Sequence, residues 1–482
     1  MPLRSRFDSL IPGVRGGAPL TVRAPFDRRP IGRLATIGAA GLERALRTAH
    51  GLFRDRERWL PLTQRIAILE RAAQLLAARA EDFAREAARE GGKPLTDSRA
   101  EVARAVDCLK LCVQTVRNDQ GEVIPMGLNA ASAGRIAFTQ TAPIGVVAAI
   151  SAFNHPVNLV AHQLGPAVAA GCPVLVKPAS ATPLSCFRFV ELLREAGLPG
   201  DWCQPLLFED QALATRLATD PRVAFLSFIG SAAVGWELKA KLAPGTRCAL
   251  EHGGVAPVIV AADADWKAAV APIVKGGYYH AGQVCVSVQR VYVDRRILAP
   301  FARALAAAVR KLRVGDPVRE TTQVGPMIDP REVQRVGDWV REAVQGGAQL
   351  LCGGKARSRT CYAPTLLLDP PEAARISRDE VFGPVVCLYG YTRLDDALRR
   401  ANALPAAFQA AVFTRSIDTA LACHRGFDAS AVMVNDHTAF RVDWMPFAGL
   451  RTSGEGVGGI PYTIHDLQVR KLLVIRSAAI RR

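Results

Sequence analysis

A cysteine between a glycine turn and a predicted strand is the residue of this chain best placed for covalent chemistry. Cys285 follows Gly282 and Gln283, and the β-branched, alternating residues 288–293 are typical of a strand. Gly282 allows a tight turn, which would let the thiol face a cavity instead of the inside of a sheet. A single cysteine is more often a small buried hydrophobe, so Cys285 alone leaves both interpretations open.

Two further polar residues stand where chemistry is common in α/β proteins. Asn154 follows the predicted strand 146–150, and the carboxyl ends of such strands are where ligands bind. Its neutral amide could stabilise an oxyanion without protonating it, although an isolated asparagine there is usually a turn or cap residue. Glu251 precedes two glycines and could act as a base, or be an ordinary surface glutamate.

A possible nucleotide site follows two other predicted strands. Lys177 ends one strand and could contact hydroxyl or phosphate groups, or simply be exposed. Gly230 and Ser231 form a turn before a predicted helix that contains Gly235, and a helix N-terminus attracts pyrophosphate. The turn is not a Gly-x-Gly-x-x-Gly fingerprint, so taken alone it is weak evidence.

Short apolar runs alternating with amphipathic segments predict an α/β fold with parallel sheets. The expected strands cover 146–150, 174–176, 225–228 and 468–475, and the expected helices cover 62–90, 97–116, 157–170, 183–196 and 232–242. Residues 257–430 repeat this texture, which indicates a second α/β domain. Residues 1–35 suggest an irregular lead-in, and 124–140 suggest an extended arm or hairpin.

Composition narrows the class of protein. The 482 residues are 49% hydrophobic and 22% charged, as in soluble globular proteins, and no apolar run is long enough to span a bilayer. Eleven scattered cysteines, with no Cys-x-x-Cys pair and no secretory signal, favour a reducing, cytoplasmic setting and no metal site. The net charge of +17 is spread along helices, which favours a solvated basic surface over a nucleic-acid site. Such a field could attract small anionic substrates.

Taken in order and spacing, these motifs resemble the aldehyde dehydrogenase superfamily from about residue 30 to the C-terminus. The Glu-x-Gly-Gly and Gly-Gln-x-Cys signatures are joined by Glu-Val-Phe-Gly-Pro at 380–384 and by the segment 446–454. The resemblance implies a Rossmann-type cofactor domain (1–121 and 142–253) and an α/β catalytic domain (254–440). It also implies a β oligomerisation arm (122–141 and 460–482), and with it a homodimer or homotetramer.

The resemblance also implies a mechanism that uses NAD or NADP. Cys285 attacks an aldehyde, the Asn154 amide and the Cys285 N–H hold the oxyanion, hydride leaves to the nicotinamide, and Glu251 activates water to hydrolyse the thioester. The cofactor-binding positions would be Lys177, Ser180, Gly230, Ser231, Gly235, Glu380 and Phe382. NAD-preferring members usually carry glutamate at the position of Ser180. We therefore expect dual cofactor use or a preference for NADP.

Three residues match positions that contact anionic substrates in the superfamily, namely His155, Arg104 and Arg441. The segments around 442–447 and 458–462 are most similar to phosphonoacetaldehyde dehydrogenases and their near relatives. Val284, however, replaces a further arginine of some such enzymes, which leaves sulfonate and carboxylate aldehydes open. Alternatives are a CoA-acylating semialdehyde dehydrogenase, disfavoured by Glu251, and a non-catalytic basic binding protein. We expect a small-molecule aldehyde as partner, and neither nucleic acid nor a membrane.

Overall fold

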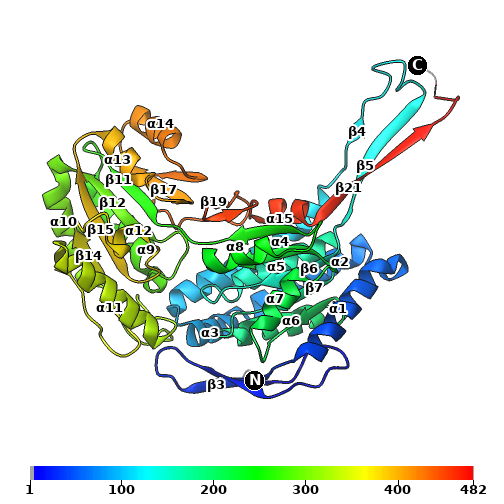
Figure 1. The fold of residues 1–482 in the computed structure, drawn as a ribbon, viewed down its shortest axis with the longest axis horizontal. Helices are drawn as coiled ribbons and strands as arrows, with labels where there is room; N and C mark the ends of the chain where they lie inside the picture. Colours follow the sequence, from blue (N-terminus) through cyan, green and yellow to red (C-terminus); the bar gives the residue numbers. More distant parts are fainter. Residues whose placement is uncertain (1–4, 481–482) are drawn as a thin grey trace.

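The chain forms two α/β lobes and a projecting β arm (Figure 1). The computed structural model describes residues 5–480; residues 1–4 of the predicted cofactor domain and 481–482 of the predicted arm lie outside the described residues. The predicted α/β class is confirmed, because each lobe is built on a mainly parallel sheet with helices on its faces. The predicted domain boundaries stay a prediction.

The first lobe contains a six-stranded sheet of order β20-β10-β9-β6-β7-β8, parallel except for β20. Its strands are β6 (Val146–Ile150), β7 (Val174–Lys177), β8 (Cys203–Pro205), β9 (Val223–Ile229), β10 (Arg247–Glu251) and β20 (Gly454–Glu455). Its helices are α1 (Ala39–Arg54), α2 (Leu62–Ala78), α3 (Ala80–Gly91), α4 (Leu95–Arg117), α5 (Asn158–Ala170), α6 (Pro183–Glu195), α7 (Ala212–Thr219), α8 (Ala232–Ala240) and α15 (Ile460–Asp466).

Both faces of this sheet are buried, which explains why its strands are continuously apolar. In β6, Val147 and Ala149 join the core formed with α2 to α6, whereas Val146 and Ala148 join the core beneath α1 and α7. Helix α15, within the range predicted for the arm, packs on the first core through Ile460.

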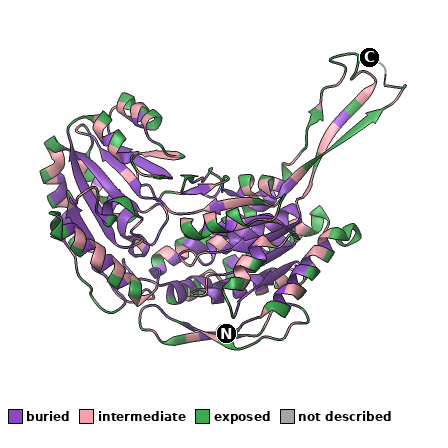
Figure 2. Ribbon diagram, in the orientation of Figure 1, coloured by how far each residue is buried: buried purple, intermediate pink, exposed green. Residues whose placement is uncertain are grey.

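The second lobe contains a seven-stranded sheet of order β13-β14-β15-β12-β11-β17-β18 around one core (Figure 2). Its strands are β11 (Ala256–Val260), β12 (Val288–Asp294), β13 (Gln349–Cys352), β14 (Thr365–Leu368), β15 (Val385–Tyr391), β17 (Gln409–Phe413) and β18 (Ala431–Val434). Its helices are α9 (Trp266–Tyr278), α10 (Arg295–Arg310), α11 (Pro330–Gln345), α12 (Arg375–Arg378), α13 (Leu394–Ala401) and α14 (Ile417–Gly426). Two short strands, β16 (Ala406–Ala407) and β19 (Leu450–Arg451), pair with each other before the chain returns to the first lobe at β20.

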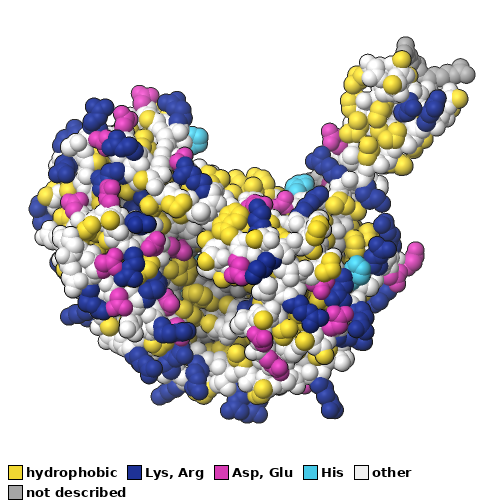
Figure 3. Space-filling model, viewed as in Figure 1, with side chains coloured by type: hydrophobic (Ala, Val, Ile, Leu, Met, Phe, Trp, Pro, Cys, Tyr) yellow, Lys and Arg dark blue, Asp and Glu magenta, His cyan; other side chains and the backbone are white. Residues whose placement is uncertain are grey.

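The arm is a three-stranded antiparallel sheet of β4 (Val123–Ile124), β5 (Arg135–Pro143) and β21 (Gln468–Arg476). It projects from the body, and apolar side chains are exposed along it (Figure 3). Leu472 and Leu473 are 57% and 50% exposed, and Leu128 at the arm's turn is 81% exposed. Within residues 5–480, no helix is long and apolar enough to cross a membrane.

Two local expectations were wrong. The single helix expected over 62–90 breaks at Arg79, where the backbone leaves helical geometry and the guanidinium pairs with Glu195. Residues expected to be irregular form a three-stranded sheet of β1 (Arg6–Phe7), β2 (Pro19–Arg23) and β3 (Pro30–Ala35). This sheet buries its apolar face against Phe187 of α6, a contact that local periodicity does not reveal.

A buried ion pair lies where α3 turns into α4. Lys93 and Glu101 are paired and both about 1% exposed. The other Glu101 oxygen accepts hydrogen bonds from the N–H groups of Val157 and Asn158 at 2.8 and 3.0 Å, at the start of α5. At the same corner the Leu95 N–H donates to the Pro317 carbonyl of the second lobe. This corner therefore fixes α4, α5 and the second lobe together.

Candidate active site

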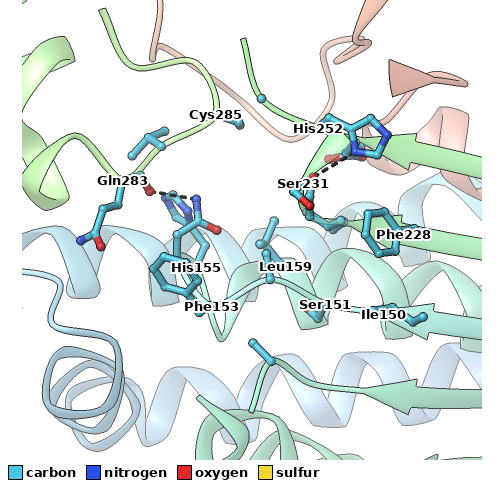
Figure 4. Close-up of a pocket in the computed structure, with 18 of the residues that line it drawn as sticks. Ile150, Ser151, Phe153, His155, Leu159, Phe228, Ser231, His252, Gln283 and Cys285 are labelled. Atoms are coloured by element: carbon cyan, nitrogen blue, oxygen red, sulfur yellow. Dashed lines mark hydrogen bonds between the residues drawn. The ribbon is translucent and has the colours of Figure 1, made fainter. Parts of the chain in front are cut away.

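A cavity of about 720 Å³ lies between the two lobes at the carboxyl ends of β6, β7, β9 and β10. The predicted site residues that line it are Arg104, Asn154, His155, Lys177, Ser180, Gly230, Ser231, Glu251, Cys285, Glu380, Phe382 and Arg441. Gly235 does not line it. That glycine lies under the His252 ring, where a Cβ would be 1.9 Å from the imidazole Cε1. Figure 4 shows Ser231 and His252 at one end of the cavity, and His155, Gln283 and Cys285 at the other.

The turn before Cys285 is held by the Gln283 side chain. Its amide nitrogen donates to the carbonyls of His280 and Pro326, both at 3.2 Å, and its amide oxygen accepts from the Ile328 N–H at 2.8 Å. Gly282 has a φ of 69°, and a Cβ there would lie 2.1 Å from the Gly383 carbonyl oxygen. Only glycine fits this turn, as the sequence predicted.

Asn154 is oriented by the same turn. Its Nδ2 donates to the Gln283 carbonyl oxygen at 3.0 Å, and the residue is buried. An amide nitrogen carries two protons, so one such bond leaves a second proton available. The asparagine amide and the cysteine thiol therefore line the same end of one cavity.

Burial shifts the Cys285 thiol and two nearby carboxylic acids, Glu251 and Glu380, toward their neutral forms. It raises the pKa of the Cys285 thiol to about 12, and the nearby Glu380 carboxylate adds to the shift. Burial raises the pKa of Glu251, while the Arg441 charge opposes that shift. Burial also raises the pKa of Glu380 to about 8, and its Oε1 has no hydrogen-bond partner among the described residues.

The nucleotide end of the cavity has one unpaired cation. Lys177 is buried, which lowers its pKa, and within residues 5–480 it has no carboxylate partner. The Ser180 hydroxyl accepts a hydrogen bond from Gln211 Nε2 at 3.3 Å. The Gly230 turn is held from both sides, because its N–H donates to the Glu251 carbonyl at 3.1 Å and its carbonyl accepts from His252 Nδ1 at 2.9 Å.

The other end contains Arg104 and Arg441, but in different states. Arg104 donates through Nε to Asp443 Oδ2 at 3.2 Å and through Nη2 to Oδ1 at 2.5 Å. The Arg441 guanidinium carbon lies 3.6 Å from the centroid of the Phe447 ring, and its buried Nε and Nη2 have no hydrogen-bond partner among residues 5–480. The two guanidinium groups expected to bind one anion are therefore not equivalent, since an aspartate already occupies the first.

Histidines complete this end in neutral form. His155 Nε2 lies 3.1 Å from the Tyr279 hydroxyl, and burial holds its pKa well below the usual range. His162 Nε2 donates to Asp443 Oδ1 at 2.8 Å, although burial lowers the pKa of His162 to about 4. No group of three or more potential metal ligands occurs among the His, Cys, Asp and Glu residues of 5–480.

Sequence reasoning missed Asp443, His162, Tyr279 and Gln211. Asp443 is only two residues after Arg441, but its partner Arg104 is 339 residues away in the sequence, so no local pattern indicates that the two side chains pair. His162 lies about one turn into α5, and Asn154 stands in the loop that leads into the same helix, so both are near its N-terminal end. No sequence signal pointed to Gln211.

Comparisons with known proteins agree with this geometry. The Aldehyde dehydrogenase family profile matches residues 14–472. A 3-sulfolactaldehyde dehydrogenase from Priestia megaterium is 39% identical over 412 residues, covering 86% of each chain.

Two solved structures are similar along nearly the whole chain. Aldehyde dehydrogenase 21 from Physcomitrella patens, in complex with the reaction product succinate, is 32% identical with a TM-score of 0.94 and covers 99% of each chain. The glyceraldehyde-3-phosphate dehydrogenase of Methanocaldococcus jannaschii, complexed with NADP, is 31% identical with a TM-score of 0.91, covering 96% of this chain and 100% of the other. The chain therefore belongs to the aldehyde dehydrogenase family.

Proposed function

We propose that this enzyme oxidises a small anionic aldehyde to its carboxylate with NAD or NADP as acceptor. The observation that carries the proposal is one cavity with Cys285 and Asn154 at one end and an unpaired lysine at the other. The family, and relatives that act on sulfolactaldehyde or were solved with succinate, support an anionic substrate.

The residues of the nucleotide end fit the cofactor. Among residues 5–480, one Glu380 carboxylate oxygen has no hydrogen-bond partner, which suits a ribose hydroxyl, and Lys177 has no carboxylate partner that a nucleotide would have to displace. Ser180, Gly230, Ser231 and Phe382 line the same end. These residues would hold NAD or NADP, whose nicotinamide would supply the hydride acceptor for the oxidation.

Cys285 begins the reaction as its thiolate, after the thiol proton has passed to water. The sulfur then forms a bond with the aldehyde carbon, and the carbonyl π bond breaks so that its oxygen becomes an oxyanion. The second N–H of the Asn154 amide donates a hydrogen bond to that oxygen, while the Gln283 carbonyl accepts the first N–H and keeps the amide in place. Loss of hydride from the same carbon leaves a thioester on the sulfur. Asn154 thus stabilises charge without supplying a proton.

Glu251 completes the reaction by accepting a proton from water as the water oxygen adds to the thioester carbon. The carbon–sulfur bond then breaks, and the carboxylate product leaves the Cys285 sulfur. The raised pKa of Glu251 makes it a stronger base than an exposed glutamate. Arg441, with buried unpartnered N–H groups, provides a site for the anionic tail of the substrate.

The first prediction concerns the protonation of the thiol. A raised pKa keeps Cys285 protonated near neutrality, so its thiolate fraction grows with pH. We expect the rate of alkylation of Cys285 by iodoacetamide in the cofactor-free protein to rise about tenfold per unit from about pH 7 to 9. Peptide mass spectrometry measures this rate, with Cys285→Ala as the blank. A plateau near neutral pH would show that the free enzyme already holds a thiolate.

The second prediction separates hydrolysis from acyl transfer to CoA. In Glu251→Gln, we expect steady-state turnover to fall about 10²- to 10⁴-fold, because water loses its base. A first-turnover burst of NADH or NADPH should persist, with an acyl adduct on Cys285 seen by mass spectrometry. The matched control is Glu237→Gln on the exposed face of α8. If the wild type turns over only when CoA is added, the hydrolytic mechanism is wrong and the enzyme transfers the acyl group to CoA.

The third prediction concerns the 2′ position of the cofactor. Ser180 and Gln211 are neutral and Lys177 is cationic, so a 2′-phosphate meets no repulsion. We expect NADPH to bind at least as tightly as NADH in equilibrium fluorescence titrations, and Ser180→Glu to weaken NADPH about tenfold more than NADH. A strong preference of the wild type for NADH would contradict this expectation.

The fourth prediction concerns the arm, for which we propose a second copy of this chain as partner. Exposed apolar residues on β21 are unusual for a monomer. Light scattering should give two or four times the chain mass of 51.7 kDa, and Leu473→Asp should lower it. Leu421→Asp on α14 is the control, because that side chain is similarly exposed, 48% against 50%. A wild-type mass of one chain would exclude this interface.

A further inference from the structure

We propose that the tail end of the cavity selects a singly charged anion, sulfonate or carboxylate, over a doubly charged phosphonate, and that Asp443 sets this choice. The inference deepens the proposed function, because it names the class of aldehyde that the cavity takes. It depends on the number of uncompensated charges around the substrate tail.

Asp443 already neutralises Arg104. The aspartate is 3% exposed, and both of its oxygens accept hydrogen bonds from the Arg104 guanidinium. His162 donates to one of these oxygens at 2.8 Å. An anionic ligand could bind Arg104 only by separating it from Asp443, and that would leave the aspartate buried and unpaired.

Arg441 is the cation at this end that no carboxylate of residues 5–480 hydrogen-bonds. Its Nε is 4.0 Å from Asp443 Oδ1, beyond hydrogen-bond reach, and both Nε and Nη2 are buried without acceptors. The guanidinium is fixed against the Phe447 ring. Buried donors of a permanent cation favour a nearby anion, and Arg441 is one of the residues that line the cavity.

No second free cation faces the tail. Within residues 5–480, the lysines and arginines that line the cavity are Arg104, Lys177 and Arg441, and Lys177 lies at the nucleotide end. Lys93, behind the wall, is paired with Glu101. Val284, beside the reactive cysteine, contributes no charge.

One anionic charge therefore completes the site. A monoanion neutralises Arg441, whereas a dianion would add an unbalanced negative charge near the buried groups Asp443 and Glu251. Interactions between like charges are strengthened there by the low dielectric. Because Arg441 is available to an anion and Arg104 is already paired with Asp443, the site distinguishes substrates by the charge of the tail more than by its shape.

The test uses four aldehydes with one skeleton, X–CH₂–CHO, in which X is sulfonate, carboxylate, phosphonate or methyl. At about pH 8.5 the phosphonate is close to doubly charged. We expect wild-type kcat/KM for the sulfonate or the carboxylate to exceed that for the phosphonate by about tenfold or more. The order of sulfonate and carboxylate identifies the natural tail.

Asp443→Asn frees Arg104 while keeping the size of the side chain. We expect this variant to move the kcat/KM ratio toward the phosphonate by about tenfold or more. Asp338→Asn, which removes an exposed carboxylate that pairs with an arginine on α11, should leave the ratio unchanged. Calorimetric binding of sulfoacetate and phosphonoacetate to both proteins should follow the same order without any chemistry.

The outcomes separate this inference from the dehydrogenase proposal. Oxidation of propanal together with equal or better use of the phosphonate by the wild type overturns the inference alone. Absence of all turnover, with sulfoacetate still bound more tightly than phosphonoacetate, refutes the dehydrogenase proposal and supports the charge selection. If Asp443→Asn does not fold, the wild-type kinetics and binding still decide.

Discussion

The wall of the cavity that α4 and the start of α5 form depends on the interactions of the buried Glu101 carboxylate. This carboxylate accepts two N–H groups at the start of α5 and pairs with Lys93, so a buried anion is both hydrogen-bonded and neutralised. The positive end of the α5 dipole adds to this stabilisation. Arg104 is one turn further along α4, and Asn154 stands in the loop that leads into α5. One carboxylate thereby positions both the loop that carries Asn154 and the helix that carries Arg104.

The sequence predicted those parts of the fold whose burial is local in pattern. Strand β6 and helices α5 and α6 lie within a residue or two of their expected bounds, because continuous apolar runs and Pro or Gly boundaries mark them. The sheet of β1, β2 and β3 was missed because its short strands are stabilised by packing against α6, far along the chain. The break at Arg79 was missed because the apolar positions on both sides keep helical spacing.

For the site, motif residues were predictable and their states were not. The resemblance supplied Cys285, Glu251 and Asn154, and all three line one cavity. It also supplied both arginines, yet only the structure reveals that Asp443 occupies Arg104 and leaves Arg441 open. Such a difference arises from pairing across 339 residues of chain, which no local pattern encodes. The sequence shows which residue types are present at the site, whereas only the tertiary structure shows which of the charged side chains are already paired.

Arg441 also links substrate charge to base strength. Its guanidinium lowers the pKa of Glu251, in opposition to the rise caused by burial. An anion placed on Arg441 weakens that effect, so the pKa of Glu251 moves upward and the carboxylate becomes a stronger base. If Arg441 binds the substrate tail as proposed, a substitution of Arg441 also changes the pKa of Glu251, the proposed base for hydrolysis. In the proposed mechanism, specificity and catalysis therefore share one charge, which ties the choice of aldehyde to the rate of thioester hydrolysis.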